Sequence, residues 1–193
     1  MSKRLYQLNY LNLFRVYSTV FFFSLLFFQS YANNHKLSFN DSAFTEQVAK
    51  ETAEHIVKYT GLSQNFQIVA DKDIPTAIAY IRGKKRYVAY NPDFILRVKD
   101  KTQTDWGAIS VLAHEIGHHL SGHTLKRRQR NLTDELEADR FSGFILYKMG
   151  ASLEETQAAI NKVELKINPT HPSKEERLKA ITNGWLDAKK LER

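Results

Sequence analysis

The feature that most constrains the fold is the pentapeptide His-Glu-Ile-Gly-His at positions 114–118, within an apolar stretch predicted to be helical over residues 105–121. Residues four apart on an α-helix lie only about 40° apart around its axis, so His114 and His118 share one face. Both imidazoles can therefore reach one tetrahedral zinc ion. The alternative is a helix with two surface histidines, which the apolar surroundings disfavour.

A third ligand is expected on the next predicted helix, residues 133–149, whose first turns hold several acids. Glu135 and Asp139 share one face of it, whereas Glu137 points about 160–200° away from both. Glu135 is therefore the better third ligand, and Asp139 the better acceptor for the N–H of a ligand imidazole. Three protein ligands leave the fourth position open, as in catalytic zinc sites. The alternative for these acids is a solvated helix start, which the helix dipole favours.

Glu115 follows the first histidine directly and can reach a water at the metal rather than the metal itself. We predict that it is the catalytic base. A third ligand of the metzincin type would require Gly at position 121 and His at position 124, where the chain has Ser121 and Thr124. The downstream carboxylate is therefore the better solution.

The segments HEIGHHLSGH and ELEADRFSG together resemble the gluzincin metallopeptidases related to HtpX and the CAAX prenyl endopeptidase, in which H-E-x-x-H is followed by E-x-x-A-D. The segment 170–172 with Arg177 resembles a third family element, and His123 matches a histidine common in the soluble branch. The resemblance covers roughly residues 86–177. The large integral-membrane relatives have several spanning helices, whereas this sequence has none after its leader. The chain therefore resembles the compact periplasmic or secreted members more closely, and the resemblance does not imply CAAX processing.

The resemblance implies a zincin-like fold and one zinc ion per chain, with Glu115 as catalytic base and Asp139 as support. The implied ligands are His114, His118 and Glu135. Three interpretations stay open for His171: it closes the fourth zinc position, it stabilises the oxyanion, or it is a loop bystander. Arg177 positions His171 or substrate, or forms a surface salt bridge.

Strand patterns gather in the first half of the chain and helical patterns in the second, which predicts an α+β fold. We expect a mostly helical domain with a small antiparallel sheet whose edge strand faces the active-site helix. The predicted helices span residues 42–60, 93–98, 105–121, 133–149, 152–165 and 173–188, and the predicted strands 65–70, 76–81 and 86–90. A capping box of Ser173 and Glu176 starts the last helix.

The N-terminal residues 1–32 are predicted to be a signal peptide. They contain three basic residues and no acid, an apolar run at 16–28, and small residues before a cleavage point after Ala32. The mature domain would span residues 33–193 and be exported, most simply to a periplasm; the alternative is an uncleaved anchoring segment. The chain has no cysteine, which excludes a lipoprotein, disulfides and thiolate zinc sites.

Charge argues against a nucleic-acid partner. The formal net charge is +7, but without residues 1–32 the chain has 25 basic and 21 acidic residues, or +4, too little for a dedicated nucleic-acid surface. The basic run KRRQR at 126–130 is interpreted as a solvated loop; the alternative is attraction to anionic lipid or acidic substrate. Peripheral association with membranes or envelope assemblies stays open, as does the oligomeric state.

The sequence thus predicts a zinc metalloendopeptidase that hydrolyses peptide bonds of unfolded or misassembled envelope proteins. The substrate would lie extended along an exposed strand of the hairpin at residues 74–90 and pair through main-chain hydrogen bonds. The alternative is a chaperone-like or assembly-binding module that holds zinc but rarely cuts.

Overall fold

The computed structural model describes residues 44–126, 130–163 and 172–192, all of which belong to one unit of the chain. The predicted signal peptide and His171 lie outside these residues. Within the described residues, no helix has the length and apolar character needed to cross a membrane.

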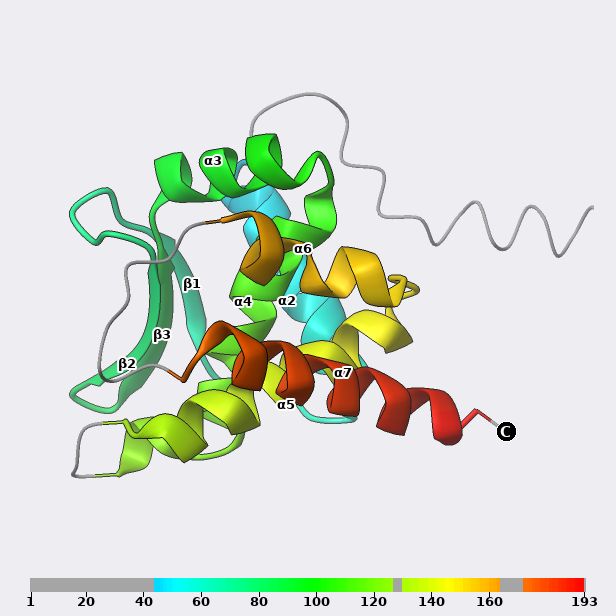
Figure 1. Cartoon of the computed structure of the whole chain (residues 1–193). Helices are drawn as coiled ribbons and strands as arrows, with labels where there is room; N and C mark the ends of the chain where they lie inside the picture. Colours follow the sequence, from blue (N-terminus) through cyan, green and yellow to red (C-terminus); the bar gives the residue numbers. More distant parts are fainter. Residues whose placement is uncertain (1–43, 127–129, 164–171, 193) are drawn as a thin grey trace, which may run out of the picture. The chain divides into compact units, whose positions relative to one another are not determined.

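The described residues form mainly helices with a small three-stranded sheet, which confirms the predicted α+β class (Figure 1). In chain order the elements are α2 (Glu46–Lys58), β1 (Gln67–Ala70), β2 (Ala77–Arg82), β3 (Lys85–Tyr90), α3 (Pro92–Thr102), α4 (Asp105–Leu120), the short 3₁₀ helix η1 (His123–Leu125), α5 (Leu132–Lys148), α6 (Leu153–Lys162) and α7 (Lys174–Lys190). The predicted capping box of Ser173 and Glu176 is present at the start of α7.

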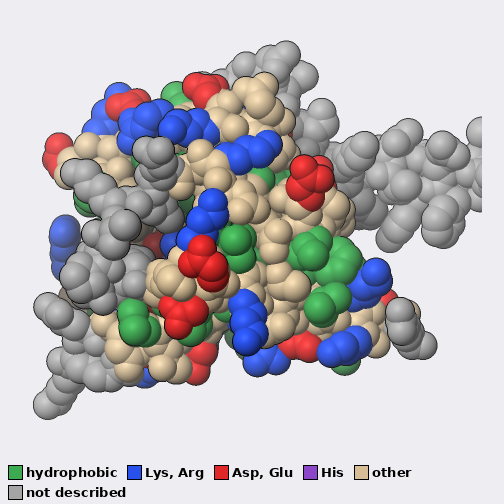
Figure 2. All heavy atoms as spheres, in the orientation of Figure 1, with side chains coloured by type: hydrophobic (Ala, Val, Ile, Leu, Met, Phe, Trp, Pro, Cys, Tyr) green, Lys and Arg blue, Asp and Glu red, His purple; other side chains and the backbone are tan. Residues whose placement is uncertain are grey.

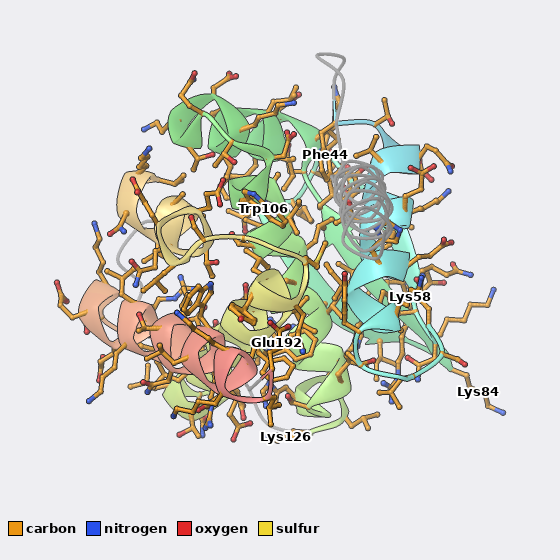
Figure 3. The ribbon with its side chains drawn as sticks, turned by 90° about the vertical axis from the view of Figure 1, so that its right-hand side faces the viewer. Phe44, Lys58, Lys84, Trp106, Lys126 and Glu192 are labelled. Carbon is orange, nitrogen blue, oxygen red and sulfur yellow. The ribbon has the colours of Figure 1, made fainter. Side chains whose placement is uncertain are left out.

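The sheet is mixed, whereas the sequence suggested an antiparallel one. Strands β2 and β3 form the expected antiparallel hairpin, and Gly83 at its turn has the positive φ of 62° that glycine adopts without strain. Lys84 beside it points away from the ribbon (Figure 3). Strand β1 pairs in parallel with β3, giving the order β1-β3-β2. The cause is the connection between β1 and β2, which crosses the end of the sheet and places β1 beside β3.

The sheet packs on α4, which also contacts α2, α3, α5 and α6 and so lies at the centre of the domain (Figure 1). Helix α4 contributes the fully buried Ile109, Leu112 and Ile116 to the core. Val111 and Leu120 of the same helix are only half-buried. Strand β2, at the edge of the sheet, lies against α4 as predicted.

Small residues allow the helices that carry the candidate site to approach closely. Gly117 of α4 faces α5, where an added Cβ would lie 3.3 Å from the Cα of Ala138. Ser142 of α5 faces α4 and donates a hydrogen bond to the carbonyl of Ser110. Gly143 of α5 faces α7 instead: an added Cβ would overlap the carbonyl of Ile181.

Replacing Gly184 of α7 with Ala should destabilise the protein by about 1–3 kcal/mol, because its Cβ would overlap the backbone carbonyl of Arg140 in α5. Helix propensity alone predicts the opposite sign, a gain of roughly 1 kcal/mol. The control is Asn183→Ala, at the exposed neighbouring position of the same helix. Chemical denaturation measures both changes. An unchanged or raised free energy of unfolding in Gly184→Ala would contradict this account of the helix crossing.

Candidate metal centre and active site

Helix α4 positions the two motif histidines and Glu115. The side chain of Thr104 caps its start by accepting a hydrogen bond from the backbone N–H of Trp106. The side chain of His118 is fully buried and that of His114 is 12% exposed. These are therefore not surface histidines, and the alternative weighed for the motif does not apply.

Helix α5 brings acids to the same place. It begins with a capping box, in which the side chains of Asn131 and Asp134 each accept a hydrogen bond from the other residue's backbone N–H. Glu135 directly follows Asp134 and faces α4. Its Oε2 lies 3.2 Å from Nε2 of His114, and its Oε1 lies 3.4 Å from Nε2 of His118. The structure thus brings together the three residues that were predicted as metal ligands.

The three groups have the spacing that a zinc ion requires. Nε2 of His114 lies 3.1 Å from Nε2 of His118, and each of these nitrogens has a carboxylate oxygen of Glu135 within 3.4 Å, a different oxygen in each case. Zinc binds nitrogen and oxygen at about 2.0–2.2 Å, and the edge of such a tetrahedron is roughly 3.3–3.6 Å. Two imidazoles and one carboxylate at this spacing therefore fit zinc.

Asp139, predicted as the support for a ligand imidazole, lies with its Oδ1 2.9 Å from Nδ1 of His114. An N–H at Nδ1 leaves the lone pair of Nε2 directed at the metal position. Arg177 of α7 in turn donates two hydrogen bonds to Asp139, from Nε at 2.8 Å and from its terminal nitrogen at 2.7 Å. Arg177 is buried, so the surface salt bridge considered for it is wrong.

The charges of the cluster shift its pKa values. Burial lowers the pKa of His114, but the carboxylates of Asp139, Glu135 and Glu115 outweigh this effect and raise it to about 9. Burial lowers the pKa of His118, which favours the neutral form that binds metals. Burial raises the pKa of Glu135, yet hydrogen bonds from the two histidines keep it far below its ordinary value. The candidate third ligand is thus a carboxylate at neutral pH.

Glu115 is held against the edge strand of the sheet. Its Oε2 accepts a hydrogen bond of 2.7 Å from the backbone N–H of Ala79 in β2. Arg130 donates a hydrogen bond to the carbonyl of the same residue, and its guanidinium lies 3.6 Å from Glu115. The catalytic candidate and a cation from the basic run therefore meet at one residue of the edge strand. The basic run had been interpreted as a solvated loop, and the contact of Arg130 with Ala79 was not predicted because the two residues lie 51 positions apart.

Two further buried histidines were not assigned from the sequence. Nε2 of His119 lies 2.9 Å from the carbonyl of Tyr87 and its Nδ1 3.0 Å from the hydroxyl of Thr124, which ties the end of α4 to β3 and η1. The burial of His119 could have been predicted from its position three residues after Ile116, because that spacing continues the buried face of α4. His123 lies beside His118 and forms a separate cluster with Asp134 and Glu137.

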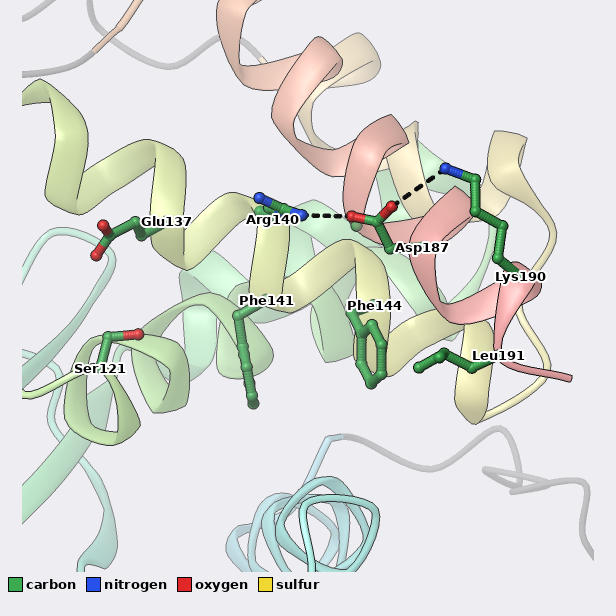
Figure 4. Close-up of a pocket in the computed structure, with 9 residues that line it drawn as sticks. Ser121, Glu137, Arg140, Phe141, Phe144, Asp187, Lys190 and Leu191 are labelled. Atoms are coloured by element: carbon green, nitrogen blue, oxygen red, sulfur yellow. Dashed lines mark hydrogen bonds and ion pairs between the residues drawn. The ribbon is translucent and has the colours of Figure 1, made fainter.

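A cavity of about 520 Å³ lies along α5 and α7, away from the three candidate ligands. Its lining includes the rings of Phe141 and Phe144 and, at one end, Glu137; Asp187 bridges Arg140 and Lys190 beside it (Figure 4). On the face shown in Figure 2, basic and acidic side chains are interspersed rather than gathered into a patch of one sign.

The sequence model of peptidase family M48 matches residues 43–133. The matched range contains the pentapeptide at positions 114–118 and ends before Glu135 and Asp139, whose place in the cluster therefore rests on the geometry above. No match was found among curated proteins or among solved structures. Members of the family are metallopeptidases that in general depend on zinc. Residues 43–133 thus match peptidase family M48, the family of HtpX and the CAAX protease, which is the family that the motifs of the chain resemble.

Proposed function

We propose that this metallopeptidase is a zinc-dependent endopeptidase of the gluzincin type, which hydrolyses peptide bonds in extended polypeptide segments. The observation that carries the proposal is the convergence of His114, His118 and Glu135 at the spacing of tetrahedral zinc ligands, with Glu115 beside them. Bound there, zinc would polarise the scissile carbonyl and acidify a water molecule.

The residues of the chain divide the remaining work. Asp139 and Arg177 hold His114 in the tautomer that exposes Nε2. Glu115 takes the proton of the attacking water and delivers it to the leaving amine. The hydrogen bond from Ala79 fixes one oxygen of Glu115 and leaves the other for this transfer. His171, predicted as a further catalytic residue, lies outside the described residues, and its three interpretations stay as predictions.

Strand β2 is the place at which an extended substrate would pair. Its register with β3 and the hydrogen bond from the N–H of Asn91 to the carbonyl of Thr76 direct the backbone groups of Ala77, Ala79 and Ile81 away from β3. A peptide added along this edge would pair through its main chain with the backbone groups that Glu115 does not occupy, so recognition would depend little on side chains. That property suits unfolded substrates.

Replacing Arg130 with Ala should raise kcat/KM for an unfolded protein substrate, by several-fold to about tenfold, because one hydrogen bond of roughly 1–1.5 kcal/mol at the carbonyl of Ala79 no longer has to be displaced. The measurement is initial-rate hydrolysis of dye-labelled casein. The control is Arg82→Ala. It removes a cation from β2, the strand of Ala79, but the side chain of Arg82 lies over the ring of Tyr80 and not at the carbonyl of Ala79. A lower kcat/KM in Arg130→Ala would show that Arg130 assists the reaction instead.

The test of the function combines zinc content with digestion. The purified protein should contain about one zinc ion per chain, cleave unfolded casein at internal bonds, lose this activity with a strong chelator and regain it when zinc is restored. Protein that binds one zinc ion but leaves unfolded casein intact over prolonged incubation would favour the chaperone-like or assembly-binding alternative. Protein that binds no zinc would contradict both.

Export and a role in quality control of envelope proteins are part of the same proposal. The support is the signal-peptide pattern of residues 1–32 together with a recognition mode that reads the main chain. Amino-terminal sequencing of the exported protein should find a start at Asn33 or within a few residues of it. An intact N-terminus in a membrane fraction would support the anchored alternative.

A further inference from the structure

His123 lies in direct contact with a candidate zinc ligand. Its Nδ1 is 2.9 Å from Nδ1 of His118, and both side chains are fully buried. On its other side, Nε2 of His123 lies 2.7 Å from Oε2 of Glu137. The two imidazoles and the carboxylate thus form a continuous chain of hydrogen bonds that leads away from the metal position.

Proton positions along this chain follow from the proposed zinc site, on which the inference rests. Only one hydrogen fits between the two Nδ1 atoms. If Nε2 of His118 binds zinc, the neutral ring has its hydrogen at Nδ1 and donates it to His123. His123 then accepts at Nδ1, has its own hydrogen at Nε2 and donates it to Glu137. Each ring nitrogen is satisfied with both imidazoles neutral.

We propose that His123, anchored by Glu137, is a positioning residue for zinc: it selects the Nδ1–H tautomer of His118 and orients its Nε2 toward the metal. Asp139 does the same for His114 with a carboxylate. The two histidine ligands therefore have different supports, one anionic and one neutral.

The competing interpretation is a second metal site formed by His123, Asp134 and Glu137, whose ligand atoms also lie close together. The proton arrangement disfavours it, because neither nitrogen of His123 has a free lone pair while His118 binds zinc. Asp134 is also engaged: Lys126 donates a hydrogen bond of 2.5 Å to its Oδ1, and its Oδ2 accepts one from the N–H of Asn131.

The direct test is the tautomer of each ring in the zinc-loaded wild type, measured by ¹⁵N NMR of labelled histidine. We expect the hydrogen of His118 at Nδ1 and that of His123 at Nε2. A hydrogen at Nδ1 of His123 would overturn the proposal. This measurement does not depend on any variant that could fail to fold.

The zinc dissociation constant, from competition with a chromogenic chelator, gives the second test. His123→Phe removes the acceptor and should weaken zinc binding by about 10–100-fold, the range typical of groups that hold a metal ligand. His123→Asn retains an acceptor oxygen near the position of Nδ1 and should restore most of the affinity. Glu137→Gln still accepts the hydrogen bond and should cost less than His123→Phe.

The matched control is His119→Phe, which alters an equally buried histidine of the same region that contacts no candidate ligand. It should change the free energy of unfolding but leave zinc affinity near that of the wild type. Unchanged affinity in His123→Phe, or equal losses in the Phe and Asn variants, would overturn the inference alone. Two zinc ions per wild-type chain, with one lost in Glu137→Gln, would establish the second metal site instead. A wild type without zinc would contradict the proposed function.

Discussion

Glu115→Gln should remove peptide-bond hydrolysis, with kcat lowered by about 10²–10⁴-fold, and leave fold and zinc binding intact. The substituted amide has no carboxylate to take a proton from water. Its oxygen can still accept the hydrogen bond from the N–H of Ala79, so the side chain keeps its place at the edge strand. Single-turnover cleavage of a quenched-fluorescence peptide, together with zinc content, measures the two expectations separately.

Glu154→Gln is the control for this change. It makes the same substitution at an exposed position in the first turn of α6 and should leave both kcat and zinc content unchanged. If Glu115→Gln lost its zinc, the residue would be part of the metal site and not a base. If it turned over at the wild-type rate, the proposed proton transfer would be wrong.

The triad of candidate ligands was predictable because it depends on two local periodicities. The spacing of four residues puts His114 and His118 on one face of α4, and Glu135 and Asp139 on one face of α5. Only the approach of the two faces is a long-range matter, and the small Gly117 in the motif itself permits it. The capping signals at Ser173 and Asn131 are local in the same sense, although only the first was identified.

The contacts of Glu137 and β1 were not predictable, because they depend on the course of the backbone between elements. The left-handed Gly122, with φ of 72°, turns the chain after α4 and folds His123 back beside His118. Glu137 was correctly predicted to point away from the face of Glu135. The helix period does not predict which residue Glu137 contacts on that other side. The parallel pairing of β1 likewise follows from a crossing connection, for which the sequence has no periodic signal.

Glu135→Gln should weaken zinc binding more than any other change in the acidic helix α5. Its carboxylate contacts both histidines, at 3.2 and 3.4 Å, and the oxygen of a neutral amide is a weaker zinc ligand than a carboxylate oxygen. We expect a loss beyond the roughly 10–100-fold typical of groups that only orient a ligand. Asp139→Asn should fall within that range, and Glu137→Gln should have the smallest effect of the three. Chelator competition gives all three dissociation constants on one scale.

The order of these losses distinguishes direct coordination of zinc by Glu135 from a general electrostatic attraction of zinc by the acids of α5. All three substitutions remove one negative charge from the same helix, so a purely electrostatic attraction of zinc would give similar losses in each. Asp139→Asn also leaves Arg177 buried beside a neutral amide, which should lower the free energy of unfolding by several kcal/mol on the order of a broken buried pair. Unfolding measurements with and without zinc distinguish that cost from a change in metal affinity. Equal zinc affinity in Glu135→Gln and Glu137→Gln would remove Glu135 from the ligand set, whatever the state of the other two.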